Sequence, residues 1–143
     1  MIGCLHVSTL RTLALASLIS LTACAAPEDV EDRQAIRATL IGTWTRPYTP
    51  LRVEPIALAG PYAIADWFQG AYAGRVLLEK RGGQWHMRLC SGDALKNVEF
   101  LQEAGVNAAS ARRLSDALRL AEAKLSTDDR DKLARFRGVV QLH

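Results

Sequence analysis

The stretch GRVLLEKRGGQWHMRLC, residues 74–90, predicts two β-strands joined by a tight turn. In its second half, apolar residues alternate with polar ones, as in a strand that buries one face. The double glycine Gly82-Gly83 is typical of a two-residue type I′ turn, because both central residues of that turn need a positive φ. We therefore expect a β-hairpin with strands over Gly74–Lys80 and Gln84–Cys90.

A two-residue turn also fixes which residues of the two strands face each other. The pairs it predicts are Glu79 with His86, Leu78 with Met87, Leu77 with Arg88, Val76 with Leu89, and Arg75 with Cys90. Side chains alternate between the two faces of a strand, so one face is expected to be apolar and to meet the helices. That face comprises Val76, Leu78, Trp85, Met87 and Leu89, whereas His86, Arg88 and Cys90 point the other way.

The flanking sequence predicts an α+β fold with a single domain over residues 30–143. Glycine and proline punctuate two earlier strands, Leu51–Leu58 and Tyr62–Gln69, joined at Ala59-Gly60-Pro61. Residues 30–44 show helical periodicity before Pro47. After the hairpin we expect helices over 93–104, 107–125 and 126–136, begun by Asp93, Asn107 and Ser126, and a closing strand over Gly138–Leu142. The expected order is a helix, a four-stranded antiparallel meander, two to three helices and a short strand.

Residues 1–23 have the features of a signal peptide. Thr12–Ala23 is an apolar run of 12 residues after Arg11, too short for a membrane-spanning helix, which needs about 20 residues. The run ends in Leu21-Thr22-Ala23-Cys24, which resembles the lipobox of bacterial lipoproteins, and this predicts Cys24 as the lipidated residue. The alternative is an ordinary signal peptide cut after a small-residue triplet near the same place. Residues 24–29 are expected to form a short tether.

Charge and cysteine usage narrow the function classes. One of the 18 basic residues, Arg11, lies in the predicted signal peptide. The remaining 17 basic residues are nearly balanced in number by 15 acidic residues. This balance argues against nucleic-acid binding. Cys4 leaves with the predicted signal peptide and Cys24 is acylated on the lipobox interpretation, so Cys90 is expected to have no internal partner in an oxidising compartment. It is either buried as a small hydrophobe, or it is a metal thiolate or a redox-reactive group.

His86, Met87 and Cys90 resemble a soft-metal site, but the predicted strand separates them. His86 and Cys90 would lie on the same face about 13 Å apart, whereas donors on one ion lie within about 4 Å of each other. Met87 would lie in the core on the other face. Cys90 remains as the candidate, because a helix N-terminus and Arg75 beside it would favour a thiolate. A second ligand would come from Met87, if a bulge turns it, or from His143.

Several stretches together resemble a family of bacterial exported proteins called copper uptake system-associated proteins. The resemblance covers about Ile36 to Leu142. It is carried by 36–40, 42–44 with Pro47, 62–67, 69–70, 74–78, 82–83 with Trp85, and 89–95, and by the later 104–106, 121–123 and 136–140. Relatives often have a histidine-rich tail, whereas this sequence has the single His143 in that place.

The resemblance implies periplasmic copper handling. Together with the lipobox-like stretch it predicts a lipoprotein that assists copper uptake, held to a membrane by its lipid and working with copper-transport or other periplasmic proteins. Within the shared stretches Cys90 is the residue that suits Cu(I). No catalytic set is expected, because a thiol nucleophile needs a nearby base and His86 lies too far along the strand. The alternative function is a lipoprotein module that binds a partner protein without metal.

Overall fold

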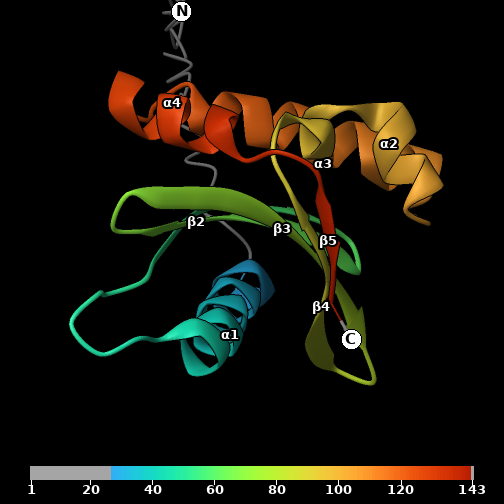
Figure 1. The fold of residues 1–143 in the computed structure, drawn as a ribbon. Coiled ribbons are helices and arrows are strands. Elements are labelled where there is room, and N and C mark those ends of the chain that lie inside the picture. Colours follow the sequence, from blue (N-terminus) through green and yellow to red (C-terminus); the bar gives the residue numbers. More distant parts are fainter. Residues whose placement is uncertain (1–26, 143) are drawn as a thin grey trace, which may run out of the picture.

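The structure, a computed structural model, describes residues 27–142 and has three layers (Figure 1). A five-stranded antiparallel sheet forms the middle layer, with strands in the order β1-β2-β3-β4-β5. Helix α1 covers one face, and α2, α3 and α4 cover the other. The predicted α+β class and strand order are confirmed.

The elements follow one another without crossing connections, so each strand pairs with the next one along the chain. They are α1 (Pro27–Trp44), β1 (Arg52–Ala59), β2 (Tyr62–Gln69), β3 (Tyr72–Arg81), β4 (Gln84–Ser91), the 3₁₀ helix η1 (Asp93–Lys96), α2 (Val98–Glu103), α3 (Ala108–Glu122), α4 (Thr127–Arg135) and β5 (Val139–Gln141).

The turn at the double glycine has the predicted geometry. Gly82 and Gly83 both have positive φ, 56° and 79°. Glu79 faces His86 and Leu78 faces Met87, as predicted. The register close to the turn is therefore set by the turn itself.

Beyond Met87 the predicted register is wrong, because β4 contains a β-bulge. The pairing skips Arg88, so that Leu77 faces Leu89, Val76 faces Cys90, and Arg75 faces Ser91. An extra residue moves every later side chain to the opposite face. Leu89 therefore packs with the core under α2 and α3, and Cys90 joins Met87 on the α1 side.

Two helix starts differ from the sequence prediction. Helix α1 begins at Pro27, inside the predicted tether 24–29, because proline suits the first helical position and Glu28 and Asp29 favour the first turn. The single helix expected over 93–104 is two pieces, η1 and α2. Asn97 separates them, since its side chain accepts the backbone N–H of Phe100 at 2.8 Å and caps α2.

The other helix signals are confirmed with small changes at the ends. Asn107 accepts the N–H of Ser110 and caps α3, and Ser126 accepts the N–H of Asp129 and caps α4. Helix α3 ends at Glu122 rather than at Leu125. Gly105, with a φ of 93°, ends α2 as expected. The predicted signal peptide, Cys24 and His143 lie outside the described residues.

Each face of the sheet has its own apolar core. On the α1 side, Ile36 and Leu40 pack on Val53, Val76 and other strand residues. On the other side, Leu101, Leu114 and Leu118 pack on Ile64, Leu77 and Leu89. Polar contacts orient α1 on the sheet: Asp32 accepts from Lys80 Nζ at 2.7 Å and from Trp85 Nε1 at 3.0 Å.

The C-terminal segment packs tightly against Gly92. A Cβ atom at Gly92 would lie 2.3 Å from the backbone oxygen of Phe136, whereas one at Gly42 in α1 would meet nothing within 4 Å. Because Gly92 has no side chain, the segment before β5 can return to the sheet.

We expect Gly92→Ala to destabilise the protein by about 1–3 kcal/mol, because the backbone of Phe136 must move. Gly42→Ala is the matched control and should stabilise it by about 0.5–1 kcal/mol, since alanine favours a helix interior. Urea unfolding followed by circular dichroism gives both values. An unchanged midpoint for Gly92→Ala would contradict this packing.

Candidate functional site

Cys90 lies near the end of β4 with 5% of its surface exposed, beside a hollow of about 500 Å³. The hollow lies on the α1 side of the sheet, and β5 closes part of its wall through Val140, which pairs with Cys90. Its other lining residues are Thr43, Trp44, Thr45, Arg46, Leu51, Trp67, Gln69, Phe136 and Leu142. We call it the Cys90 hollow.

The surroundings of Cys90 keep it a neutral thiol. Of the two alternatives that the sequence left open, the structure has the buried thiol and not the thiolate. Burial raises the pKa of the Cys90 thiol to about 12. The indole N–H of Trp67 acts in the opposite direction and lowers that pKa, but Trp67 Nε1 has no hydrogen-bond partner of ordinary geometry. The predicted helper Arg75 faces Ser91, and its guanidinium binds Glu122 on α3, on the other side of the sheet. A thiolate at Cys90 is therefore disfavoured in the free protein.

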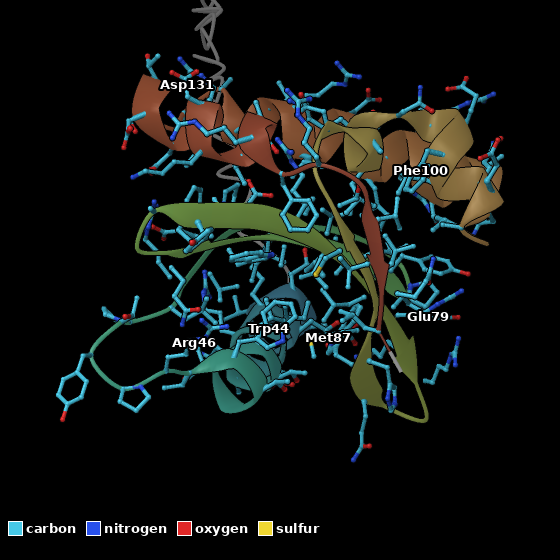
Figure 2. All side chains as sticks on the ribbon, viewed as in Figure 1. Trp44, Arg46, Glu79, Met87, Phe100 and Asp131 are labelled. Carbon is cyan, nitrogen blue, oxygen red and sulfur yellow. The ribbon has the colours of Figure 1, made fainter. Side chains whose placement is uncertain are left out.

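The bulge brings Cys90 to the same face as Met87. Both side chains belong to the core on the α1 side, where their partners on β3 are Leu78 and Val76. Those two partners are two residues apart, so the Cα atoms of Met87 and Cys90 are expected about 7 Å apart. Leu142 lines both the Cys90 hollow and a neighbouring hollow of about 480 Å³ that Met87 lines. Figure 2 shows Met87 and Trp44 on the α1 side of the sheet.

The predicted ligand His86 is not grouped with Cys90, and His143 lies outside the described residues. His86 is exposed, faces Glu79 across the hairpin, and lines the hollow of Met87 rather than that of Cys90. Within residues 27–142, no group of three or more His, Cys, Asp and Glu side chains is placed to hold a metal ion. The structure thus brings together two of the four predicted ligands on one face, Cys90 and Met87.

A second cluster lies on the opposite face of the sheet, and sequence reasoning missed it. Arg75 on β3 is 1% exposed and binds Glu122 of α3 through two hydrogen bonds, of 2.6 and 2.9 Å. Asp66 lies opposite Arg75 on β2, with its Oδ1 3.8 Å from Arg75 Nε. Lys96 and Asp93 of η1 complete the cluster, and each forms an ion pair with one of these residues.

The charges of this cluster balance only if it holds a proton. Three carboxyl groups face two cations, and both oxygens of the fully buried Asp66 have no hydrogen-bond partner. Burial raises the pKa of Asp66 to about 8, and the negative charge of Glu122 raises it further than Arg75 lowers it. With a proton, Asp66 can donate to the Glu122 carboxylate. The cluster is then neutral, which suits its position under α3.

The sequence does contain a signal for the pair formed by Asp66 and Arg75. Asp66 and Arg75 are charged residues inside otherwise apolar strands, and they lie at equal distances from the turn between β2 and β3. Opposite charges at paired positions of a hairpin indicate a cross-strand ion pair. Glu122 has no such signal, because its approach depends on how α3 packs on the sheet.

No family model, no curated protein and no solved structure matches this chain. Among the helices of residues 27–142, none combines the length and the apolar character that crossing a membrane requires.

We expect the stability of the protein to fall as the pH rises toward 8. The pKa of Asp66 is about 8 in the folded protein, above its ordinary value of 3.8, so folding retains a proton that the unfolded chain loses. This stabilisation is complete below about pH 4 and declines by up to about 1.4 kcal/mol per pH unit until the pH passes about 8.

Asp66→Asn should remove most of this slope, because the amide resembles the protonated acid and does not titrate. Asp116→Asn, at an exposed position of α3, is the control and should keep the slope. Urea unfolding at several pH values between 6.5 and 8.5 measures the free energy of unfolding of each protein. The same slope in Asp66→Asn and in the unmodified chain would show that Asp66 is ionised at neutral pH.

Proposed function

We propose that this protein is an exported, non-enzymatic accessory of copper handling, and that it binds Cu(I) weakly through Cys90 and Met87. The observation that supports the proposal most is the bulge in β4, since it places a thiol and a thioether on one face, each beside one of two hollows that share Leu142. Thiolate and thioether sulfurs are the donors that suit Cu(I). The resemblance to copper uptake system-associated proteins points to the same metal.

The proposed binding requires two local changes. Cu(I) must displace the proton of Cys90, whose pKa burial raises to about 12, so binding releases one proton. Leu142, which lines the hollows of both sulfur residues, must move aside for the sulfurs to meet at one ion. Leu142 follows the short strand β5 and donates its backbone N–H to the oxygen of the bulge residue Arg88 at 2.9 Å. Both requirements favour weak and reversible binding.

The proposal of a binding protein rather than an enzyme has its own support. A cysteine nucleophile needs a base within hydrogen-bond distance. His86 lines a hollow that Cys90 does not line, and the pKa of Cys90 lies far above neutral pH. These features fit a ligand-holding thiol better than a reactive one.

Anaerobic competition with a chromophoric Cu(I) chelator tests the metal site. The chain is prepared with Cys4→Ser and Cys24→Ser, which leaves Cys90 as its only thiol. We expect Cys90→Ser to weaken Cu(I) binding by about 100-fold or more and Met87→Leu by about 10-fold, because the charged thiolate is the stronger donor. Affinity should also rise about tenfold per pH unit between pH 6 and 9, one proton being released for each ion bound.

His86→Ala is the matched control, since it removes a predicted ligand that lies away from Cys90, and it should leave the affinity unchanged. Near-ultraviolet circular dichroism confirms that each variant is folded. Equal affinities of Cys90→Ser and the parent would refute the site. An effect of His86→Ala as large as that of Met87→Leu would move the site to the hollow that those two residues share.

The second candidate function is a partner-binding module that needs no metal. It is favoured by β5, the edge strand of the sheet, where Val139 and Val140 keep 45% and 50% of their surface exposed. An edge strand with exposed valines offers free backbone groups to another chain. A copper-transport protein or another periplasmic protein would be the partner. The two candidates are compatible if that partner delivers or receives the ion.

The proposed location rests on the lipobox-like stretch before Cys24, which would place the protein on a bacterial membrane facing the periplasm. We expect a bacterial host that expresses the full chain to attach labelled palmitate to the protein, and Cys24→Ser to abolish the label. Cys4→Ser is the control and should keep it. Secretion of an unlabelled, shortened protein by the parent chain would instead support an ordinary signal peptide.

A further inference from the structure

A second hollow, of about 560 Å³, continues from the Cys90 hollow. Both are lined by Arg46, Trp67, Gln69 and Phe136, so the two lie on either side of this shared row of side chains. The second hollow extends past the turn between β2 and β3 to α4. We call the two together the aromatic-basic groove.

The floor of the groove is built from aromatic rings in fixed positions. Trp67 packs edge to face against both neighbours, with ring centroids 5.8 Å from Trp44 and 6.2 Å from Phe136. Gly74 makes this stack possible, since a Cβ atom there would lie 2.8 Å from the ring of Phe136 and 2.9 Å from that of Trp67. At the outer end of the groove, Tyr72 keeps 75% of its surface exposed. A flat apolar molecule would therefore meet ring edges and faces along the groove.

The loop that overhangs the groove is held in place. Gln69 Nε2 donates to the backbone oxygens of Trp44 at 3.0 Å and of Thr49 at 3.2 Å. This cross-link fixes residues 44–49 against β2 and places Arg46 at the junction of the two hollows. Figure 2 shows Arg46 on this loop, on the α1 side of the sheet.

The charges along the groove are of one sign. Arg46, Lys132 and Arg135 line it, and no aspartate or glutamate does. Within residues 27–142, neither Arg46 nor Arg135 has a carboxylate within 4.0 Å, whereas Lys132 pairs with the exposed Asp128. Lys132 and Arg135 are three residues apart on α4, which places them on one side of the helix. Asp128 is also near enough to Arg135 to interact with its charge, although no carboxylate of the described residues lines the groove itself. The lining therefore creates a positive potential where a ligand would lie.

We propose that the aromatic-basic groove binds a small aryl carboxylate, with its ring system on the floor of Trp67 and Phe136 and its carboxylate at Arg46 and Arg135. Each hollow has the size of typical small-molecule sites, about 300–1,000 Å³. Arginine is the side chain best suited to a carboxylate, since its guanidinium can donate two parallel hydrogen bonds. The proposal goes beyond copper binding and does not depend on it, because no step requires Cys90 to lose its proton.

Calorimetric titration of the full chain with 2-naphthoate, without copper, tests the proposal, and the neutral 2-naphthamide serves as the ligand control. We expect saturable binding of naphthoate with a Kd of about 0.1–1 mM. The amide should bind about 10-fold more weakly or worse, since it has the same ring system without the charge. The double variant Arg46→Gln/Arg135→Gln should lose at least about 10-fold in naphthoate affinity. Both arginines are exposed, so the variant is expected to fold.

Arg112→Gln is the protein control, because Arg112 is an exposed cation on α3 that does not line the groove. It should leave naphthoate binding unchanged. Equal binding of the acid and the amide, or equal naphthoate binding by the double variant and the parent, would overturn the proposal. The proposal would also be overturned if the protein bound phosphatidylglycerol vesicles but not naphthoate. That result would indicate that Arg46, Lys132 and Arg135 bind a membrane surface. The copper titration is a separate measurement, so either proposal can fail alone.

Discussion

The bulge at Arg88 determines the chemical character of both faces of the sheet. The extra residue is held by two contacts of its own side chain, to Glu79 Oε2 at 2.6 Å and to the backbone oxygen of Ala104 at 3.2 Å. The second contact satisfies a carbonyl at the end of α2, where helices leave such groups without a partner. Arg88, the residue that the pairing of β3 with β4 skips, therefore links the hairpin to the layer of α2, α3 and α4. As a consequence Leu89 fills the core under the helices, and Cys90 turns to the side of α1.

The two sides of the sheet are stabilised in different ways. Under α3, a buried network of Asp66, Arg75 and Glu122 ties β2 and β3 to the helix, and its charges balance through a proton. On the α1 side, Cys90 and the edge-to-face rings of Trp44, Trp67 and Phe136 pack mainly through apolar contacts, while Asp32 ties α1 to β3 and β4. A charged network is costly to disrupt once it is buried, because each partner would be left unpaired. Breaking the network under α3 is therefore expected to cost more than moving an apolar side chain beside Cys90.

The sequence predicted those features that depend on neighbouring residues. The double glycine specified the turn and the register beside it as far as Leu78 and Met87, and Asn107 and Ser126 marked the starts of two helices. The bulge escaped prediction because residues 84–90 alternate as an unbroken strand does, with no glycine to mark an insertion. The side chain of Arg88 stabilises the bulge through contacts of which one is to Ala104, 16 residues later in the sequence. The sequence left Cys90 open between a buried thiol and a thiolate for the same reason, since its apolar surroundings come from Trp44, Phe136 and other residues distant in the sequence.

The environment of Cys90 also constrains what a copper site here could do. With its pKa raised by burial to about 12, the thiol keeps its proton at pH 7, and competition with that proton lowers the apparent affinity for a metal. A partner protein whose thiols have ordinary pKa values near 8.5 bears a much smaller penalty. An ion held at Cys90 would therefore pass readily to such a partner, and the exposed edge strand β5 lies next to the hollow through which it would leave. A buried, protonated thiol thus fits transient transfer of a soft ion better than its storage.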